Sequence, residues 1–347
     1  MVVVLYIFTY LLALVLEQSG EKPKQYVLMA SCTLLAVMAG FRNPNIWPDS
    51  LVYMESFQNY TKSLVEWSVS DRPFGYGEYG FYFLGVIFKT FSSSVLGYFI
   101  FIAVLSFLFL YKDFQRYCVY PLFGLCVYIA RFYLSRNFIQ IRAGLSYAII
   151  LWAVQYITNR DWRRYFFWIL VAYYFHRSAL VAVPLYFLCL LNPKKRILLF
   201  GIIGAFLLAG LGNRLVTAYI GDNATDLDII TYTSEDYQSE FGLRNPMIYF
   251  QLFFLWIYTW GEKTFQKLSK DYFTIRTAYW YSTCILISLS AYTALSGRTS
   301  SMFSTLEMAI IPMIVNVFSK KHKVFTYVGI GVTLTIIFYF NSVLLRK

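Results

Sequence analysis

The chain has 347 residues, of which 59% are hydrophobic and only 14% are charged, and apolar runs of near membrane-spanning length recur along it. This composition excludes an ordinary soluble protein and is typical of a polytopic helical membrane protein. The net charge of +12 would suggest a nucleic-acid partner for a soluble protein, but here the basic excess of cytoplasmic loops explains most of it. We therefore expect an all-α integral membrane protein whose partner is the lipid bilayer and not nucleic acid.

About twelve spanning helices are predicted. They cover residues 2–16, 26–41, 95–111, 118–134, 138–157, 162–175, 178–191, 196–211, 246–260, 272–295, 302–318 and 324–340. The first run has no basic segment before it and no small-residue cleavage site after it, so it is interpreted as a span and not as a cleaved signal. Because no stretch is long and polar enough to be a separate soluble domain, residues 1–347 are predicted to form a single transmembrane domain.

Basic residues in alternate loops predict the orientation, since they concentrate on the cytoplasmic side. The loops between them face outward, and the main ones are residues 42–76, 212–245 and 296–301. Because inner and outer loops alternate, the apolar segment 77–91 must enter and leave on the outer side, as a re-entrant or interfacial helix. The same alternation makes residues 162–191 a short hairpin that turns at His176. The predicted cytoplasmic groups include Lys194, Lys195, Arg196, Lys263, Lys267 and Arg276.

The basic residues on the outer side are almost all arginine, whereas the inner side is rich in lysine. Orientation needs only charge, but the planar fork of arginine is preferred where phosphate or carboxylate is bound through two hydrogen bonds. The outer arginines are therefore interpreted as a sign of an anion-binding site. They are Arg42, Arg72, Arg131, Arg136, Arg142, Arg177, Arg214, Arg244 and Arg298.

A short polar stretch, residues 135–142, opens an apolar helix that is expected to start near position 138. An arginine at that depth usually has an assigned partner, and a helix N-terminus adds N–H groups and partial positive charge. Arg136 and Arg142 are about 120° apart on a helical wheel, so they would bracket an anion there. Asn137 and Gln140 have the spacing of an N-cap residue and its partner. In the alternative to anion binding, the Arg136 side chain extends to the membrane–water interface and Arg142 pairs with Asp49 or Glu78.

Two carboxylates, Asp49 in the first outer loop and Glu78 just after it, are candidates both for that pairing and for proton transfer. Asp49 follows Arg42 in a turn rich in Pro and Asn, and it either lies near a reaction centre or caps a short helix. Arg42 either contacts an anion or extends to the interface. Glu78 stands at the start of the apolar segment 77–91, and it either accepts a proton from a ligand hydroxyl or favours a helix start electrostatically.

The remaining outer candidates follow later in the chain. His176 at the predicted hairpin tip is either a structural histidine or a residue that binds ligand or transfers a proton. Arg298 precedes the predicted helix 302–318 and is a second candidate for holding an anion. Ser304 and Glu307 fit a capping box. The loop 212–245 is acidic in its middle, which fits either a solvated surface or a lid over a cavity.

Motifs of other chemistries are absent from the sequence. It contains no P-loop, no HExxH and no GxSxG, which argues against an ATP-driven pump and against a common type of hydrolase. The five cysteines lie in or beside apolar runs without CxxC spacing, so neither a disulfide nor a metal site is expected. We predict that no metal and no cofactor is needed.

Taken in order, several of these stretches resemble the EpsG/Wzy family of bacterial polysaccharide polymerases. The matching pieces are residues 40–53 with Arg42 and Asp49, Glu78 before an apolar helix, and residues 140–145 with Arg142. Residues 175–184 with His176 and Gly297 with Arg298 complete the set. The resemblance extends over most of the chain, although the outer loop 212–245 is shorter than in the wider Wzy pattern and leaves the acceptor site unassigned.

The resemblance implies a metal-independent glycosyltransferase with a fold like that of the C-type membrane enzymes. Such an enzyme joins oligosaccharide repeat units carried on undecaprenyl pyrophosphate at the outer (periplasmic) face of the bacterial inner membrane. Its partners would be these lipid-linked oligosaccharides and the bilayer, and a chain-length regulator protein is a candidate partner. The growing chain would leave its lipid pyrophosphate for the non-reducing end of the incoming unit.

This chemistry suits the outer residues. Breaking the glycosidic bond leaves negative charge on pyrophosphate, which arginines and helix N-termini can stabilise, and a carboxylate or histidine can take the acceptor proton. One base and direct attack predict inversion at the anomeric carbon. The residues assigned to pyrophosphate are Arg142, Arg298, Arg136 and Arg42, and those considered for the base are, in order, Asp49, His176 and Glu78.

Two other functions remain open from the sequence. An O-antigen ligase would share the fold and the phosphate chemistry and would differ in its acceptor. A flippase or transporter of lipid-linked sugars would also use outward arginines, but its polar groups should occur in both membrane halves. Here the polar groups concentrate on one side, which favours the polymerase.

Overall fold

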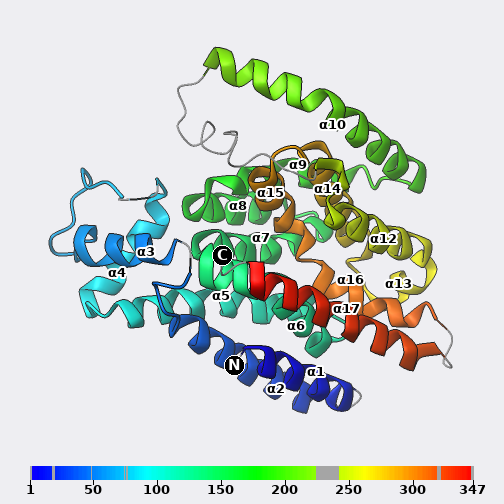
Figure 1. Ribbon diagram of the computed structural model, residues 1–347, viewed down its shortest axis with the longest axis horizontal. Coiled ribbons are helices and arrows are strands. Elements are labelled where there is room, and N and C mark those ends of the chain that lie inside the picture. Colours follow the sequence, from blue (N-terminus) through cyan, green and yellow to red (C-terminus); the bar gives the residue numbers. More distant parts are fainter. Residues whose placement is uncertain are drawn as a thin grey trace. The chain divides into compact units, whose positions relative to one another are not determined.

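The computed structural model describes residues 2–17, 20–47, 49–73, 75, 77–223, 242–318 and 322–344, and its regular elements are helices (Figure 1). They form two compact units. The first comprises Met1–Ala182 with Glu307–Lys347, and the second comprises Val183–Leu306. Each unit is described by itself. The prediction that a loop starts at residue 212 is wrong, because helix α10 (Lys195–Asn223) continues to Asn223, and most of the acidic residues predicted in that loop lie outside the described residues.

The first unit contains most of the predicted site residues. Its helices are α1 (Val2–Leu16), α2 (Glu21–Gly40), α3 (Ser50–Glu55), η1 (Ser56–Tyr60), α4 (Tyr79–Phe91), α5 (Val95–Tyr117), α6 (Pro121–Tyr128), η2 (Ile129–Ile139), α7 (Ile141–Thr158), α8 (Trp162–Phe175), η3 (Arg177–Ala182), α16 (Glu307–Met313), η6 (Ile314–Asn316) and α17 (Lys323–Leu344). Most residues of helix α7 are buried, as expected of a central helix, and α5, α8 and η2 pack around it.

Among the described residues, three helices are both long enough and apolar enough to cross a membrane. They are α5, α7 and the part of α17 from Lys323 to Val343. Shorter apolar helices cover Tyr6–Leu16, Tyr79–Phe91, Arg177–Leu190 and Glu307–Asn316. The structure therefore agrees with an all-helical membrane protein, but it does not confirm the predicted count of about twelve spans.

Two predicted helix starts are wrong by several residues. Helix α6 passes directly into the π-helix η2, whose wide turns continue to Ile139, so α7 begins at Ile141 and not near position 138. Residues 296–301, predicted as a loop, lie inside α15 (Thr293–Ser304). Hydroxyl groups allow this: Thr299 Oγ1 donates to the Leu295 carbonyl at 2.6 Å, and Thr305 donates to the Ser301 carbonyl at 2.9 Å. A run of Ser and Thr can therefore bond back to its own helix and stay helical.

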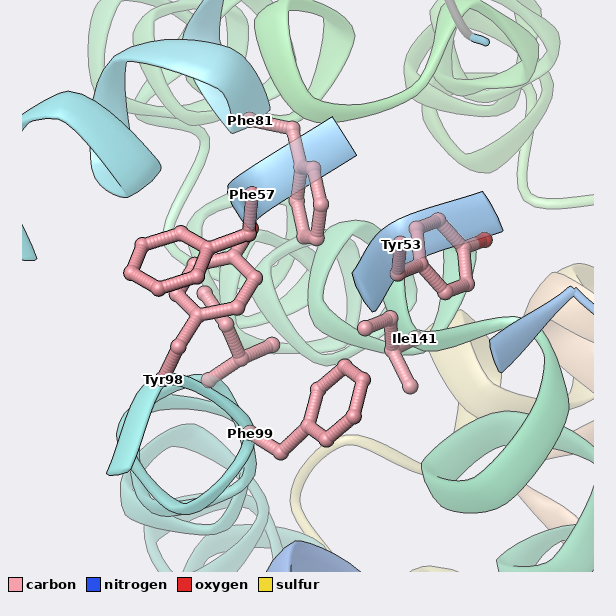
Figure 2. Close-up of a cluster of buried hydrophobic side chains, with 7 residues drawn as sticks. Tyr53, Phe57, Phe81, Tyr98, Phe99 and Ile141 are labelled. Atoms are coloured by element: carbon pink, nitrogen blue, oxygen red, sulfur yellow. The ribbon is translucent and has the colours of Figure 1, made fainter. Parts of the chain in front are cut away.

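An aromatic cluster joins α3 and η1 to the rest of the first unit (Figure 2). The Phe57 and Tyr98 rings stack with centroids 4.3 Å apart, and the Tyr53 and Phe81 centroids are 5.8 Å apart. In Figure 2 the Tyr53 hydroxyl points away from the other rings. Short helices such as α3 and η1 are marginal alone, so this packing holds them in place. The buried members of the cluster are Tyr53, Phe57, Phe81, Tyr98, Phe99, Ile102 and Ile141.

The second unit is built around α14. Its helices are α9 (Val183–Leu190), α10 (Lys195–Asn223), η5 (Gly242–Arg244), α12 (Pro246–Trp260), α13 (Glu262–Leu268), α14 (Tyr272–Ser288) and α15. Helices α9, α10, α12 and α15 all contact α14. The Trp280 indole donates to the Leu198 carbonyl at 2.9 Å, which joins α14 to α10. A Cβ on Gly201 would lie 2.2 Å from the Trp280 ring, so this close approach requires glycine.

Replacing Phe57 by alanine is expected to destabilise the first unit, because the side chain is 1% exposed and stacks on Tyr98. The cavity and the lost packing should cost about 3–5 kcal/mol of unfolding free energy. Thermal unfolding of detergent-solubilised protein measures the change. Val65→Ala is the control, because Val65 is 91% exposed and should leave the midpoint unchanged. Equal midpoints for the two variants would show that the aromatic cluster does not stabilise the unit.

Candidate active site

The carboxylate of Glu78 is the centre of the candidate site. One oxygen, Oε2, accepts a hydrogen bond from Nη1 of Arg142, and the other, Oε1, lies 3.0 Å from Nδ1 of His176. On its far side Arg142 donates from Nε to the Tyr53 hydroxyl at 3.4 Å. Three residues that the sequence singled out separately therefore meet in one cluster. Of the two pairings considered for Arg142, the structure shows the one with Glu78.

A close backbone contact places Glu78 beside His176. Glu78 occupies the N-cap position of α4, and its side chain makes no cap hydrogen bond. His176 follows α8 directly, at the turn into η3, where the predicted hairpin was to turn. Helices α4 and α8 meet at Gly80, where an added Cβ would lie 2.7 Å from the Tyr174 carbonyl oxygen. Because no side chain fits between them, the start of α4 lies against the end of α8.

A second backbone contact places Arg142. It is the second residue of α7, directly after the Gln140 junction with η2. A Cβ on Gly144 would lie 2.5 Å from the Arg136 carbonyl oxygen, so glycine permits η2 to lie against the first turn of α7. Arg142 therefore lies at a helix start, as predicted.

Electrostatics keep Glu78 ionised. Its burial raises the pKa, but the hydrogen bond with His176 and the charge of Arg142 lower it by more, so the pKa of Glu78 lies below its usual range. A carboxylate with a lowered pKa is a weak proton acceptor. It is well suited to orient an imidazole and to stabilise its protonated form. Glu78 is therefore placed to orient the His176 imidazole.

Arg42 is a buried cation with unused hydrogen-bonding capacity. It is 6% exposed, its Nη1 donates to the Asn137 carbonyl at 2.6 Å, and its guanidinium lies 3.9 Å from the Phe99 ring centroid. Its Nε and Nη2 have no hydrogen-bond partner among the described residues. Burial lowers the pKa of Arg42 to about 10, so the group remains charged at neutral pH. A buried guanidinium without a carboxylate is suited to receive an anion.

Arg136 lies inside η2 and is 3% exposed. Its guanidinium lies 4.5 Å from the Phe132 ring centroid and 5.0 Å from the Tyr147 ring centroid. The prediction that Asn137 caps the following helix is wrong, because η2 continues through it and its Oδ1 accepts from the Tyr128 hydroxyl at 2.8 Å. Arg136 therefore precedes the start of α7 and does not bracket it with Arg142.

Asp49, the first choice for the base, lies apart from these contacts. It is exposed, its backbone is left-handed with φ of 64°, and its side chain makes no cap hydrogen bond to α3. The short-helix prediction that follows it is correct, since α3 starts at Ser50. Asp49 therefore neither pairs with Arg142 nor caps α3 through its side chain.

Arg298 belongs to the second unit and is described apart from the cluster. It lies within α15 and not ahead of a helix, since α15 starts at Thr293. The predicted capping box of Ser304 and Glu307 is also wrong, because Glu307 accepts a hydrogen bond from Arg131 Nε at 2.7 Å.

The buried pair of Arg131 and Glu307 is a feature that the sequence analysis missed. The Glu307 side chain is fully buried and that of Arg131 is 9% exposed. The signal was available, because Arg131 stands alone in an apolar run and an arginine in such a place needs a carboxylate. Among the described residues no three potential metal ligands lie together, so this part of the chain offers no cluster of side chains for a metal ion.

Comparison with known proteins gives one result. The sequence model of the EpsG family matches residues 25–346, which is nearly the whole chain. No curated protein and no solved structure matches it. The family match covers every residue assigned to the cluster.

Replacing Glu78 by glutamine is expected to destabilise the protein by about 3 kcal/mol at pH 7, because Arg142 loses its charged partner. The lowered pKa of Glu78 sets the pH dependence. Its stabilising contribution is complete above the usual glutamate pKa of about 4.3 and is lost as the pH falls through the lower folded-state value. Thermal midpoints of both proteins between pH 7 and pH 3 should therefore converge at the acid end. A constant difference across this range would contradict the ion-pair assignment.

Proposed function

The chain belongs to the EpsG family, and from that premise we propose that it joins undecaprenyl-pyrophosphate-linked oligosaccharide repeat units at the outer face of the bacterial cytoplasmic membrane. Family membership supports a polysaccharide polymerase of glycosyltransferase type. The single observation that carries the finer proposal is the cluster in which Glu78 bonds both Arg142 and His176. It combines a held imidazole with a cation at a helix start, and Arg42 adds a buried cation in the same unit.

The reaction is a direct displacement at the anomeric carbon. The hydroxyl at the non-reducing end of the incoming unit attacks C1 of the sugar at the reducing end of the growing chain. A new C1–O bond forms as the bond from C1 to the pyrophosphate oxygen breaks, and the acceptor proton passes to the base. The lipid pyrophosphate leaves with the bonding electrons. A single displacement inverts the configuration at C1.

His176 is the base in this proposal. Its Nδ1 lies 3.0 Å from Glu78, so Nδ1–H donates to the carboxylate and Nε2 becomes the proton-accepting nitrogen. The negative charge of Glu78 then stabilises the imidazolium that forms. Asp49 moves to second place because it is exposed and lies outside these contacts.

Arg42 is the first candidate for stabilising the leaving pyrophosphate. Two of its buried nitrogens have no partner among the described residues, so an oxyanion would complete their hydrogen bonding without displacing a protein group. Arg142 and the N–H groups at the start of α7 supply further positive potential. Arg136 contributes charge from η2. Arg298 stays a candidate from the second unit.

The site should face outward, since the positive-inside pattern assigns its loops to the periplasmic side. The lipid carrier places the reacting pyrophosphate at the membrane surface. A chain-length regulator protein is the expected protein partner. No metal is required, because guanidinium groups and helix N–H groups can supply the positive charge that a leaving diphosphate needs.

The decisive experiment is reconstitution with lipid-pyrophosphate-linked repeat units, without ATP and with a chelator present. We expect a ladder of products that differ by one repeat unit. A single transfer to lipid A core would instead indicate a ligase. Transbilayer movement of the lipid-linked unit without any new glycosidic bond would indicate a flippase. Either of these results would overturn the polymerase assignment.

Replacing Arg42 by lysine should lower the initial polymerisation rate roughly hundredfold, because lysine keeps the charge but loses the two parallel donors. The rate of ladder formation per folded protein measures the effect. Arg72→Lys is the matched control, since Arg72 is an exposed outer arginine whose hydrogen bonds go to the carbonyls of its own loop. If both variants polymerise at the parent rate, Arg42 does not hold the pyrophosphate.

Replacing His176 by glutamine should lower the rate by roughly 10²- to 10⁴-fold and remove the acidic limb of the pH–rate profile. Glutamine can still donate to Glu78 but cannot act as the base. The profile between pH 5 and pH 9 is the measurement, with thermal unfolding as the check on folding. A variant that retains the acidic limb would move the base role to Asp49.

A further inference from the structure

A basic cavity of about 610 Å³ lies wholly within the second unit, at the start of α10. The loop between α9 and α10 forms one side, and α13 and α14 contribute the other. Four basic residues and one acidic residue line it, which leaves an excess of three positive charges. They are Lys194, Lys195, Arg196 and Arg276, with Glu262.

The charges at the start of α10 are unfavourable without an anion. Helix α10 has 29 residues and begins at Lys195. A helix N-terminus carries partial positive charge, so it favours acidic side chains in the first turn and disfavours basic ones. The first turn of α10 has no acidic residue, and three consecutive basic residues begin at Lys194. A bound anion would offset this repulsion.

One carboxylate from α13 offsets only part of the charge. Glu262 Oε2 lies 3.4 Å from Lys195 Nζ and 3.3 Å from Arg276 Nη1. A single carboxylate oxygen is therefore shared by two cations. The remaining cations of the cavity, Lys194 and Arg196, are exposed at its edge.

Arg276 is the buried cation of the cavity. It is 2% exposed, and its Nη2 donates to the Pro193 carbonyl at 2.8 Å. Its Nε is buried and has no hydrogen-bond partner among the described residues. A buried guanidinium nitrogen without a partner is costly, and this one belongs to a residue that lines the cavity.

We propose that this cavity is a binding site for a phosphate group, formed by residues other than those of the proposed polymerase site. Lys194 and Lys195 contact the phosphate oxygens together with the N–H groups at the start of α10, and Arg276 fixes the base of the cavity through Pro193 and Glu262. The positive-inside pattern places these basic residues on the cytoplasmic side.

The surroundings favour the headgroup of an anionic phospholipid as the source of the phosphate. Ile197 on the first turn of α10 is 52% exposed, and Phe273 in the lining is 38% exposed. Exposed apolar side chains beside a basic cavity suit a ligand that has both a phosphate and acyl chains. Basic cavities between membrane helices bind anionic headgroups in this manner.

The test uses the purified full-length protein in detergent, with native mass spectrometry to follow binding of phosphatidylglycerol and of phosphatidylcholine. The double variant Lys194→Gln, Lys195→Gln should bind phosphatidylglycerol roughly 30-fold more weakly than the parent. The control is Lys263→Gln, Lys267→Gln, which removes the same charge from exposed positions of α13 outside the cavity lining. A parallel arm measures the thermal shift caused by millimolar inorganic phosphate.

The two arms separate the sources of phosphate. Selective loss of phosphatidylglycerol binding in the cavity variant, without any response to inorganic phosphate, supports a lipid headgroup. A phosphate-dependent thermal shift that disappears only in the cavity variant supports a site for which free phosphate suffices. If the two double variants lose affinity equally, or if the parent does not prefer phosphatidylglycerol to phosphatidylcholine and shows no phosphate shift, the proposal is wrong. None of these readouts depends on polymerase activity.

Discussion

The ion pair between Arg142 and Glu78 is the interaction on which the candidate site depends. A guanidinium placed among apolar helices requires a partner, and four arginines of this chain show how that need is met. Arg142 has Glu78, Arg131 has Glu307, and Arg276 shares Glu262 with a lysine. Arg42 has one carbonyl and an aromatic ring but no carboxylate. Among these four arginines, Arg42 is therefore the one without a carboxylate partner in the described part of the chain.

The same ion pair gives Glu78 and His176 different roles within the cluster. Glu78 is committed to Arg142 and His176 at once, which lowers its pKa and makes it an orienting group. The fixed negative charge of Glu78 favours the protonated form of the His176 imidazole. The proposed glycosyl transfer requires a hydroxyl near His176 and a diphosphate near Arg42. The EpsG family match, which covers residues 25–346, gives this arrangement its functional context.

The sequence was sufficient for the helical class and for several helices to the residue, among them residues 2–16, 162–175 and 246–260. These runs are bounded by clear polar breaks. The prediction of helix bounds failed in the hydroxyl-rich α15, where Ser and Thr side chains form hydrogen bonds within the helix. It also failed at Asn137, where the chain continues as a π-helix. The sequence also identified Glu78, Arg142 and His176 as candidate residues. It could not show that they are in contact, because they come together only through tertiary packing. Asp49 was favoured because carboxylates in structured turns often act in sites, and composition cannot show which carboxylate is buried.

The contact at Gly80 has a consequence for how this site can vary. The backbones of α4 and α8 are in contact at Gly80, and no side chain lies between them. This contact sets the distance between the Glu78 carboxylate and the His176 imidazole. A methyl group there would have to move α4 away from α8, and Glu78, two residues earlier, would move with it. Position 80 therefore couples the spacing between the Glu78 carboxylate and the His176 imidazole directly to the presence of a glycine.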